Sequence, residues 1–227
     1  MEQLINGWEK VIDFGLLNST LSKISIPNIC PEKQNVFRAF KLCSLDNCKV
    51  VFLGQDPYPQ KGVATGILFG NNRDVEESNL SPSLRVIKEA VIDYTKPHNL
   101  PIYFDNSLES WAESGILMIN SALTVEMNKI GSHTQLWRPF MSRLIKNLSS
   151  SRKGIVYVLF GEQAQTFEPY IDKQGNYILK EKHPAFYARS HKLMPSLVFY
   201  KINDYLRNLY GEEIVWYKEY EIREQEN

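Results

Sequence analysis

The sequence predicts an α/β fold in which a central four-stranded, mostly parallel sheet is flanked by helices on both faces. Four short runs are apolar at every position, which is typical of strands buried on both faces. Helical patterns separate these runs, and strands that alternate with helices favour a parallel sheet. Polar side chains follow each run, where the ligand site of such a sheet is expected.

The elements follow from local patterns in chain order. Residues 1–45 predict a helical lead-in, because Leu4, Trp8, Ile12 and Leu16 have helical spacing. The four apolar runs, rich in β-branched and aromatic residues, predict strands at residues 50–53, 116–119, 155–160 and 177–179.

Helix signals lie between and after these strands. Ser81 can cap a helix that has Pro82 at its first position. A second helix is expected to start at Asn106, whose side chain caps while Glu109 reaches back, and to end at Gly115. Amphipathic patterns predict two further helices at residues 135–148 and 195–210.

Composition limits the domain count and the mode of any nucleic-acid binding. A chain of 227 residues, 43% hydrophobic, can bury one sizeable core, so residues 1–227 are expected to form one domain with a charged, frayed tail at 212–227. The 26 basic and 26 acidic side chains cancel, so any DNA contact must be local.

Cofactor and membrane signals are not visible in the sequence. Cys30, Cys43 and Cys48 lie outside any paired zinc-binding spacing, and phosphate-binding glycine loops are missing, so we expect free thiols, no metal and no cofactor. Without an apolar stretch of about 18 residues or a secretion signal, we expect a cytoplasmic protein, or one inside the host cell if the source is a virus.

Polar residues cluster at the predicted strand ends. The first strand is followed by Gln55, Asp56 and Tyr58, the second by Asn120, and the fourth by His183. Because parallel strands end at one edge of the sheet, a carboxylate, an amide and an imidazole are expected to meet there.

This trio suits the cleavage of an N-glycosidic bond, in which the sugar becomes cationic and the departing base anionic. Asp56 can stabilise the cation and orient water, while His183 donates a hydrogen bond to the oxygen that gains charge. Asn120 carries both a donor and an acceptor and can read one edge of a pyrimidine. Taken singly, Asp56 is more often a turn residue, Asn120 a loop cap and His183 a packed imidazole, but their combination favours a site.

Several motifs in order resemble the classical, family-one uracil-DNA glycosylases over residues 44–210. They are Gly54-Gln55-Asp56-Pro57-Tyr58 with Gly66 and Phe69, Pro82-Ser83-Leu84, Leu108-Glu109-Ser110-Trp111, Asn120 with Leu123-Thr124-Val125, Ser132-His133, Gly161 with Ala164-Gln165, and His183-Pro184.

The resemblance implies a role for each residue around a flipped-out base. Asp56 would position water, His183 would bind the uracil 2-oxygen, and Asn120 would read N3 and the 4-oxygen. The backbone at Gln55 would hold the base and Phe69 would stack on it. By the same resemblance, Tyr58 would exclude the methyl group of thymine; taken alone, Tyr58 and Phe69 are more often core residues.

The DNA-facing residues implied by the resemblance are Pro82, Ser83, Pro184, Ala185, Tyr187 and Arg189. Here the chain departs from the family: Pro59 replaces a His that contacts water, and Ala185 and Ala188 replace two serines that grip phosphate. Tyr187 stands where the family has the Leu that enters the vacated stack, and an aromatic ring can serve there. Arg189, with Ser190 and His191, is a candidate to replace the lost phosphate contacts.

Two other functions remain open from the sequence. The scaffold can be a catalytically weak DNA-docking or processivity module, or a glycosylase for mispaired or damaged pyrimidines. The family resemblance also implies a monomer, DNA containing uracil as substrate, and inhibition by a DNA-mimicking protein.

Overall fold

A four-stranded parallel sheet forms the centre of the computed structural model, which describes residues 6–92 and 100–220. The strand order is β4-β2-β6-β7, with β2 at Val50–Gly54, β4 at Ile116–Asn120, β6 at Val156–Phe160 and β7 at Tyr177–Glu181. Every neighbouring pair is parallel, which confirms the predicted sheet.

The register brings the predicted polar residues to one edge. Gly54 is opposite Asn120 at the ends of β2 and β4, and Phe160 is opposite Glu181 at the ends of β6 and β7. The segments that begin at Gln55, Gly161 and Lys182 therefore leave the sheet side by side.

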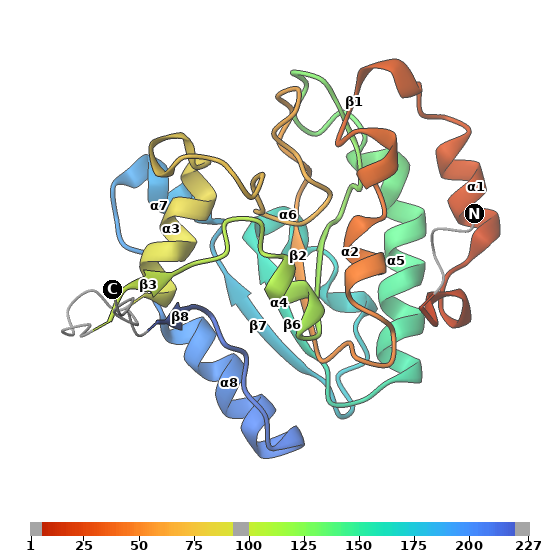
Figure 1. Ribbon diagram of the computed structural model, residues 1–227. Coiled ribbons are helices and arrows are strands. Elements are labelled where there is room, and N and C mark those ends of the chain that lie inside the picture. Colours follow the sequence, from red (N-terminus) through yellow and green to blue (C-terminus); the bar gives the residue numbers. More distant parts are fainter. Residues whose placement is uncertain (1–5, 93–99, 221–227) are drawn as a thin grey trace, which may run out of the picture.

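Helices cover both faces of this sheet (Figure 1). They are α1 (Phe14–Leu21), α2 (Arg38–Leu42), α3 (Pro82–Val91), α4 (Glu109–Glu113), α5 (Thr134–Ser151), α6 (Gly161–Gln165), α7 (Pro184–Ser190) and α8 (Leu197–Tyr210). Successive strand residues point to opposite faces. Val51 and Leu53 join the core that contains buried residues of α1, α2, α5 and α6, whereas Val50 and Phe52 join the core under α3, α4, α7 and α8.

Two helix caps differ from the prediction. Ser81 precedes α3, but its hydroxyl forms a hydrogen bond with the Tyr58 hydroxyl at 2.7 Å and makes no capping bond within the described chain. Before α4, Asp105 takes the expected role of Asn106, since its carboxylate accepts from the Ser107 and Ser110 N–H groups. Glu109 does not reach back.

Arg38 and Arg73 form ion pairs with the Glu109 carboxylate instead. These pairs connect α4 with α2 and with the loop before α3.

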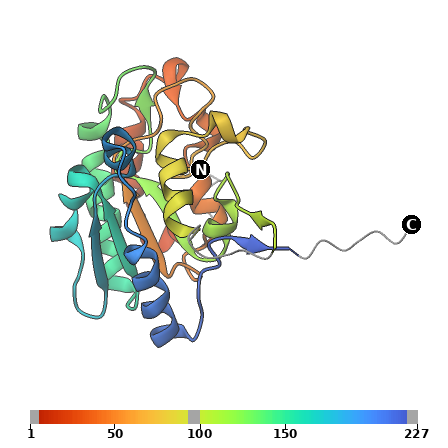
Figure 2. The same cartoon turned by 90° about the vertical axis from the view of Figure 1, so that its left-hand side faces the viewer.

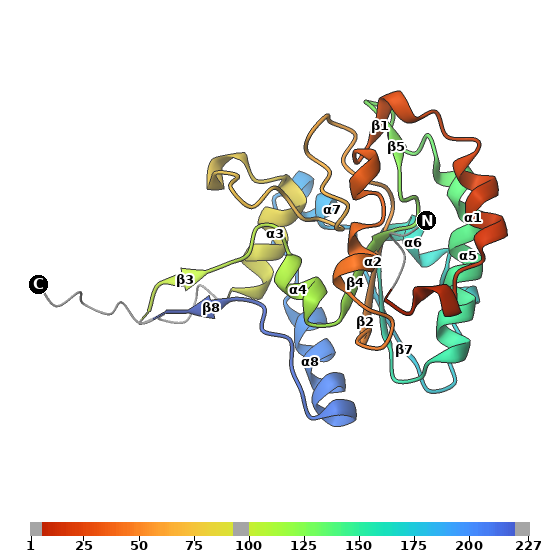
Figure 3. The same ribbon diagram turned by 45° about the vertical axis from the view of Figure 1, so that its right-hand side comes forward.

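The ends of the chain add short elements. The lead-in contains β1 (Ile29–Cys30), which pairs with β5 (Val125–Glu126), and β3 (Ile102–Tyr103) pairs with β8 (Lys218–Glu219), as Figures 2 and 3 show. Short 3-10 helices occupy Trp8–Lys10, Ile26–Asn28, Lys33–Asn35, Glu77–Asn79 and Glu168–Tyr170.

The predicted tail is structured over residues 212–220, where Ile214 is buried and β8 pairs with β3. Leu4 and residues 221–227 lie outside the described part, and the single domain remains a prediction. No helix in residues 6–92 and 100–220 is both long and apolar enough to cross a membrane.

Candidate active site

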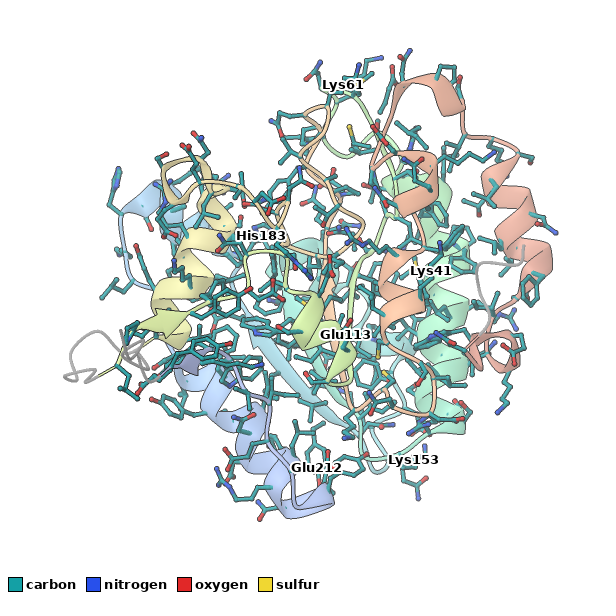
Figure 4. The ribbon with its side chains drawn as sticks, viewed as in Figure 1. Lys41, Lys61, Glu113, Lys153, His183 and Glu212 are labelled. Carbon is teal, nitrogen blue, oxygen red and sulfur yellow. The ribbon has the colours of Figure 1, made fainter. Side chains whose placement is uncertain are left out.

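A pocket of about 280 Å³ opens at the carboxyl edge of the sheet, a volume near the lower limit for small-molecule sites. Most predicted site residues line it: Gln55, Asp56, Tyr58, Phe69, Ser83, Asn120, His183, Ala185 and Arg189. Figure 4 places His183 at this edge, whereas Lys153 and Glu212 lie at the opposite end of the sheet.

The end of β2 is held rigidly against the segment after β4. The Gln55 carbonyl accepts hydrogen bonds from the Ser121 hydroxyl and from the Ala122 N–H, both at 2.9 Å. A Cβ atom on Gly54 would lie 2.4 Å from Leu68 Cδ1 and 2.8 Å from Asn120 Oδ1, so only glycine allows this approach. The backbone at Gln55 is thus preorganised beside the pocket.

Asp56 is oriented by one backbone donor from a distant segment. Its Oδ2 accepts a hydrogen bond from the Gly131 N–H at 2.6 Å. Burial raises the pKa of Asp56 above its usual value, and the Gly131 N–H opposes this rise. The carboxylate is therefore fixed in direction but only partly stabilised by the protein.

The segment that carries Gly131 is itself held by Ser132 and His133. The Ser132 hydroxyl accepts from the Glu126 N–H at 2.8 Å, and His133 Nδ1 lies 2.9 Å from the Thr124 hydroxyl. Sequence reasoning did not identify Gly131, although the neighbouring Ser132-His133 motif is a signal that could have pointed to it.

Asn120 lines the pocket and has one unused hydrogen-bond acceptor. Its Oδ1 is buried and has no hydrogen-bond partner among the described residues. A buried carbonyl oxygen without a partner costs about 1–3 kcal/mol, so such a group in a pocket indicates a ligand that donates a hydrogen bond.

His183 is held as a neutral ring. Its Nδ1 accepts a hydrogen bond from the Ala185 N–H at 3.2 Å, which leaves the proton of the neutral imidazole on Nε2. Burial, with a contribution from the Arg189 guanidinium, lowers the pKa of His183 to about 4. Gly161 allows the ring to approach, since a Cβ atom there would lie 3.0 Å from His183 Cβ.

Phe69 and Tyr58 form apolar walls of the pocket. Phe69 has a φ of 65° and lies edge-on to His183, with ring centroids 5.4 Å apart and an interplanar angle of 71°. The bond to Ser81 holds the Tyr58 hydroxyl in place. Burial raises the pKa of Tyr58 to about 12, so its hydroxyl stays neutral.

The predicted DNA-facing residues divide into two groups. Ser83, Ala185 and Arg189 line the pocket, whereas Pro82 and Pro184 begin α3 and α7 beside it and do not line it.

Tyr187, which was expected to face DNA, packs against the protein in this structure. It is only 8% exposed and its hydroxyl donates to Glu181 Oε1 at 2.6 Å. The exposed aromatic residue of α7 is Phe186, at 36% exposure, which sequence reasoning missed. The rotation of a short helix against the core decides this, and the local sequence does not contain it.

The arrangement combines a directed carboxylate, a neutral imidazole donor and an amide with a free acceptor around one apolar slot. Such a site can hold a planar amide-bearing ring, with the carboxylate near an adjacent cationic centre. In residues 6–92 and 100–220, no cluster of three or more His, Cys, Asp or Glu side chains is placed to hold a metal ion.

The sequence matches one family model and several proteins that are named uracil-DNA glycosylase. The model of the uracil DNA glycosylase superfamily matches residues 40–207. The uracil-DNA glycosylase of Fusobacterium nucleatum is 31% identical, with 95% of this chain and 97% of that protein covered. The corresponding enzyme of Aliarcobacter butzleri is 33% identical, with 92% and 99% covered.

Solved structures support the same fold. The crystal structure of mimivirus uracil-DNA glycosylase gives a TM-score of 0.73 at 24% identity and covers 92% of this chain and 89% of that chain. A substituted mimivirus UNG, solved in complex with UGI, gives a TM-score of 0.72 at 24% identity, with 89% and 86% covered.

Proposed function

Because this chain belongs to the uracil DNA glycosylase superfamily, we propose that it is a DNA N-glycosylase that hydrolyses the bond between uracil and deoxyribose in DNA. This reaction initiates base-excision repair. The observation that carries the proposal is that Asn120, whose carbonyl oxygen has no partner among the described residues, lines one pocket together with the directed carboxylate of Asp56 and the neutral imidazole of His183.

Asn120 reads the base in this proposal. Its Oδ1 accepts from the N3–H of uracil and its amide N–H donates to the 4-oxygen. Cytosine has no N3–H and carries an amino group at position 4, so it presents the opposite pattern. The Gly54 backbone packs closely against the Asn120 side chain and keeps its amide from adapting to the wrong base.

His183 and Asp56 stabilise the two charges that develop as the bond breaks. The C1′–N1 bond pair leaves with the base, and the proton on His183 Nε2 hydrogen-bonds to the 2-oxygen of the uracil anion. The Asp56 carboxylate faces the cationic sugar and directs water to C1′, and the proton released by that water passes to the carboxylate.

Tyr58 and Phe69 supply shape selectivity. Phe69 packs against the ring of the base, and Tyr58 occupies the space that a 5-methyl group requires. The Tyr58 ring cannot easily withdraw, because its hydroxyl is bound to Ser81. Thymine is therefore excluded by contact.

DNA binding completes the proposal. The pocket is recessed, so the nucleotide must leave the helical stack to enter it, at a cost of a few kcal/mol. We assign Pro82, Ser83, Pro184, Ala185 and Arg189 to the DNA-facing rim, with Arg189 as the cation for a flanking phosphate. The docking-module alternative is not favoured, since the charge-stabilising residues are all present.

The finer properties remain part of the proposal. We infer a monomer that works in the cytoplasm. The mimivirus UNG complex with UGI supports an inhibitor protein as a partner.

An excision assay tests the function directly. Purified protein, with chelator present, is incubated with single-stranded and duplex oligonucleotides that carry one uracil, and abasic sites are cleaved with alkali. We expect cutting only at uracil, at least about 100-fold slower for Asp56→Asn, as for loss of a general base. The control is Asp46→Asn, whose side chain is 80% exposed at the other end of the sheet. Absence of cutting by the unsubstituted protein contradicts the proposal.

A further inference from the structure

A second cavity, of about 240 Å³, lies beside the active-site pocket. Ala64 lines both cavities, so the two adjoin at this residue. Figure 4 shows Lys61, which also lines the second cavity, at the same end of the sheet as His183. We call this cavity the basic groove, and the residues of its lining that matter below are Ile29, Pro31, Glu32, Lys33, Lys61 and Met127.

The basic groove has an apolar lining with cations around it. Pro31 is buried and Ile29 and Met127 are half-buried, whereas Lys33 and Lys61 are exposed. Its volume is close to the 280 Å³ of the active-site pocket, so it has room for one more base. An apolar lining for a base and exposed cations for phosphates together suit a nucleotide.

The charges of the basic groove are available to a ligand. Within residues 6–92 and 100–220, neither Lys33 nor Lys61 forms an ion pair with a carboxylate. Glu32 also lines the groove, and its carboxylate accepts a hydrogen bond from the Gln34 amide. Two lysines against one glutamate leave a net positive charge on a protein whose overall charge is zero, so the groove favours an anionic ligand.

On the basis of the function proposed above, we propose that the basic groove binds the DNA strand next to the flipped uracil nucleotide. A neighbouring base enters the groove, and its phosphates meet Lys33 and Lys61. The occupant is the substrate strand because the groove adjoins the active-site pocket at Ala64 and carries the charge opposite to that of DNA.

The wall of the basic groove is bonded to the loop that carries Asp56. The Cys30 thiol donates to the Pro59 carbonyl at 3.4 Å and to the Gln60 carbonyl at 3.6 Å. The Asn128 N–H donates to the same Pro59 carbonyl at 3.0 Å. These bonds fix the groove relative to Asp56, so a nucleotide bound there holds the uracil nucleotide in register with the carboxylate.

The test uses single-stranded oligonucleotides of equal length with one uracil in the centre, near the 5′ end or near the 3′ end. Equal length gives equal charge, so general attraction to DNA affects all three alike. A strand that leaves the pocket toward the groove in one direction can fill it from the central uracil and from one terminal uracil. Lys33→Ala combined with Lys61→Ala should therefore raise KM several-fold for those two substrates, and leave the third substrate and every kcat unchanged.

Salt dependence measures the phosphate contacts directly. With an uncleavable uracil analogue in the centre, the slope of log Kd against log salt concentration should fall by about 1.4 in the double variant, since each phosphate of a single strand contributes about 0.7. Glu32→Gln should tighten binding, because it removes a negative charge beside the strand. The matched control combines Lys41→Ala with Lys201→Ala, at exposed lysines on α2 and α8, and should change neither readout.

Equal effects of the double variant on all three substrates, or none on any of them, overturn the assignment of the basic groove. A failure of the proposed function is distinguishable, because the unsubstituted protein then excises uracil from none of the three.

Discussion

Removal of the Asn120 side chain should separate stability from activity. Most buried asparagines contribute to stability through their hydrogen bonds, but Asn120 Oδ1 has none in the described chain. The burial of this unsatisfied group destabilises the folded protein by about 1–3 kcal/mol. Asn120→Ala removes this cost, which offsets the small loss of packing. We expect the free energy of unfolding to change by less than about 1 kcal/mol.

Activity should respond in the opposite way. Two hydrogen bonds to a buried base, each worth about 1.5–2 kcal/mol in a site closed to water, correspond to a loss of about 100- to 1000-fold in kcat/KM. The assays are urea unfolding followed by intrinsic fluorescence, and excision of uracil from a labelled oligonucleotide.

Asn176 provides a matched control. Its Oδ1 accepts from the Ile155 N–H at 3.1 Å, and its amide donates to the Ser149 and Asp172 carbonyls at 2.9 and 2.8 Å. Asn176→Ala should therefore destabilise the protein by about 2–4 kcal/mol and leave the chemistry intact. If Asn120→Ala is destabilised as much as Asn176→Ala, or excises uracil at the normal rate, the reasoning is refuted.

Three further substitutions test other parts of the site. Tyr58→Ala should admit the 5-methyl group and give measurable release of thymine from a T·G duplex, and no release of thymine would contradict steric exclusion by Tyr58. The folded pKa of His183 is lowered from 6.5 to about 4, so its neutral form stabilises the fold fully above pH 6.5, and this contribution decreases as the pH falls toward 4. His183→Gln should remove this part of the pH dependence of the free energy of unfolding between pH 6.5 and 4. An unchanged pH dependence would mean that another group titrates in this range. Arg189→Ala should reduce the salt slope of DNA binding by about one and raise the pKa of His183 in an NMR titration, and an unchanged salt slope would show that Arg189 meets no phosphate.

Much of the fold was predictable because its signals are local. The strand residues around Val51 and Phe52 are apolar at every position, and this pattern requires burial on both faces wherever the strand lies. Pro82 at the start of α3 has the same local character. The strands are parallel as predicted, so their last residues, Gly54 and Asn120, lie opposite each other at one edge.

The sequence by itself determined the sheet, its polar edge and the set Asp56, Asn120 and His183, since each follows from periodicity or from motif order. The tertiary structure alone decided which aromatic ring of α7 faces solvent, that Gly131 orients Asp56 across 75 residues, and that Asp105 rather than Asn106 caps α4. The physical reason is that helix rotation and loop contacts depend on packing between distant segments. Neighbouring side chains of a helix point about 100° apart, so the rotation of α7 about its own axis decides which of its aromatic rings is buried. The seven residues of α7 do not by themselves specify this rotation.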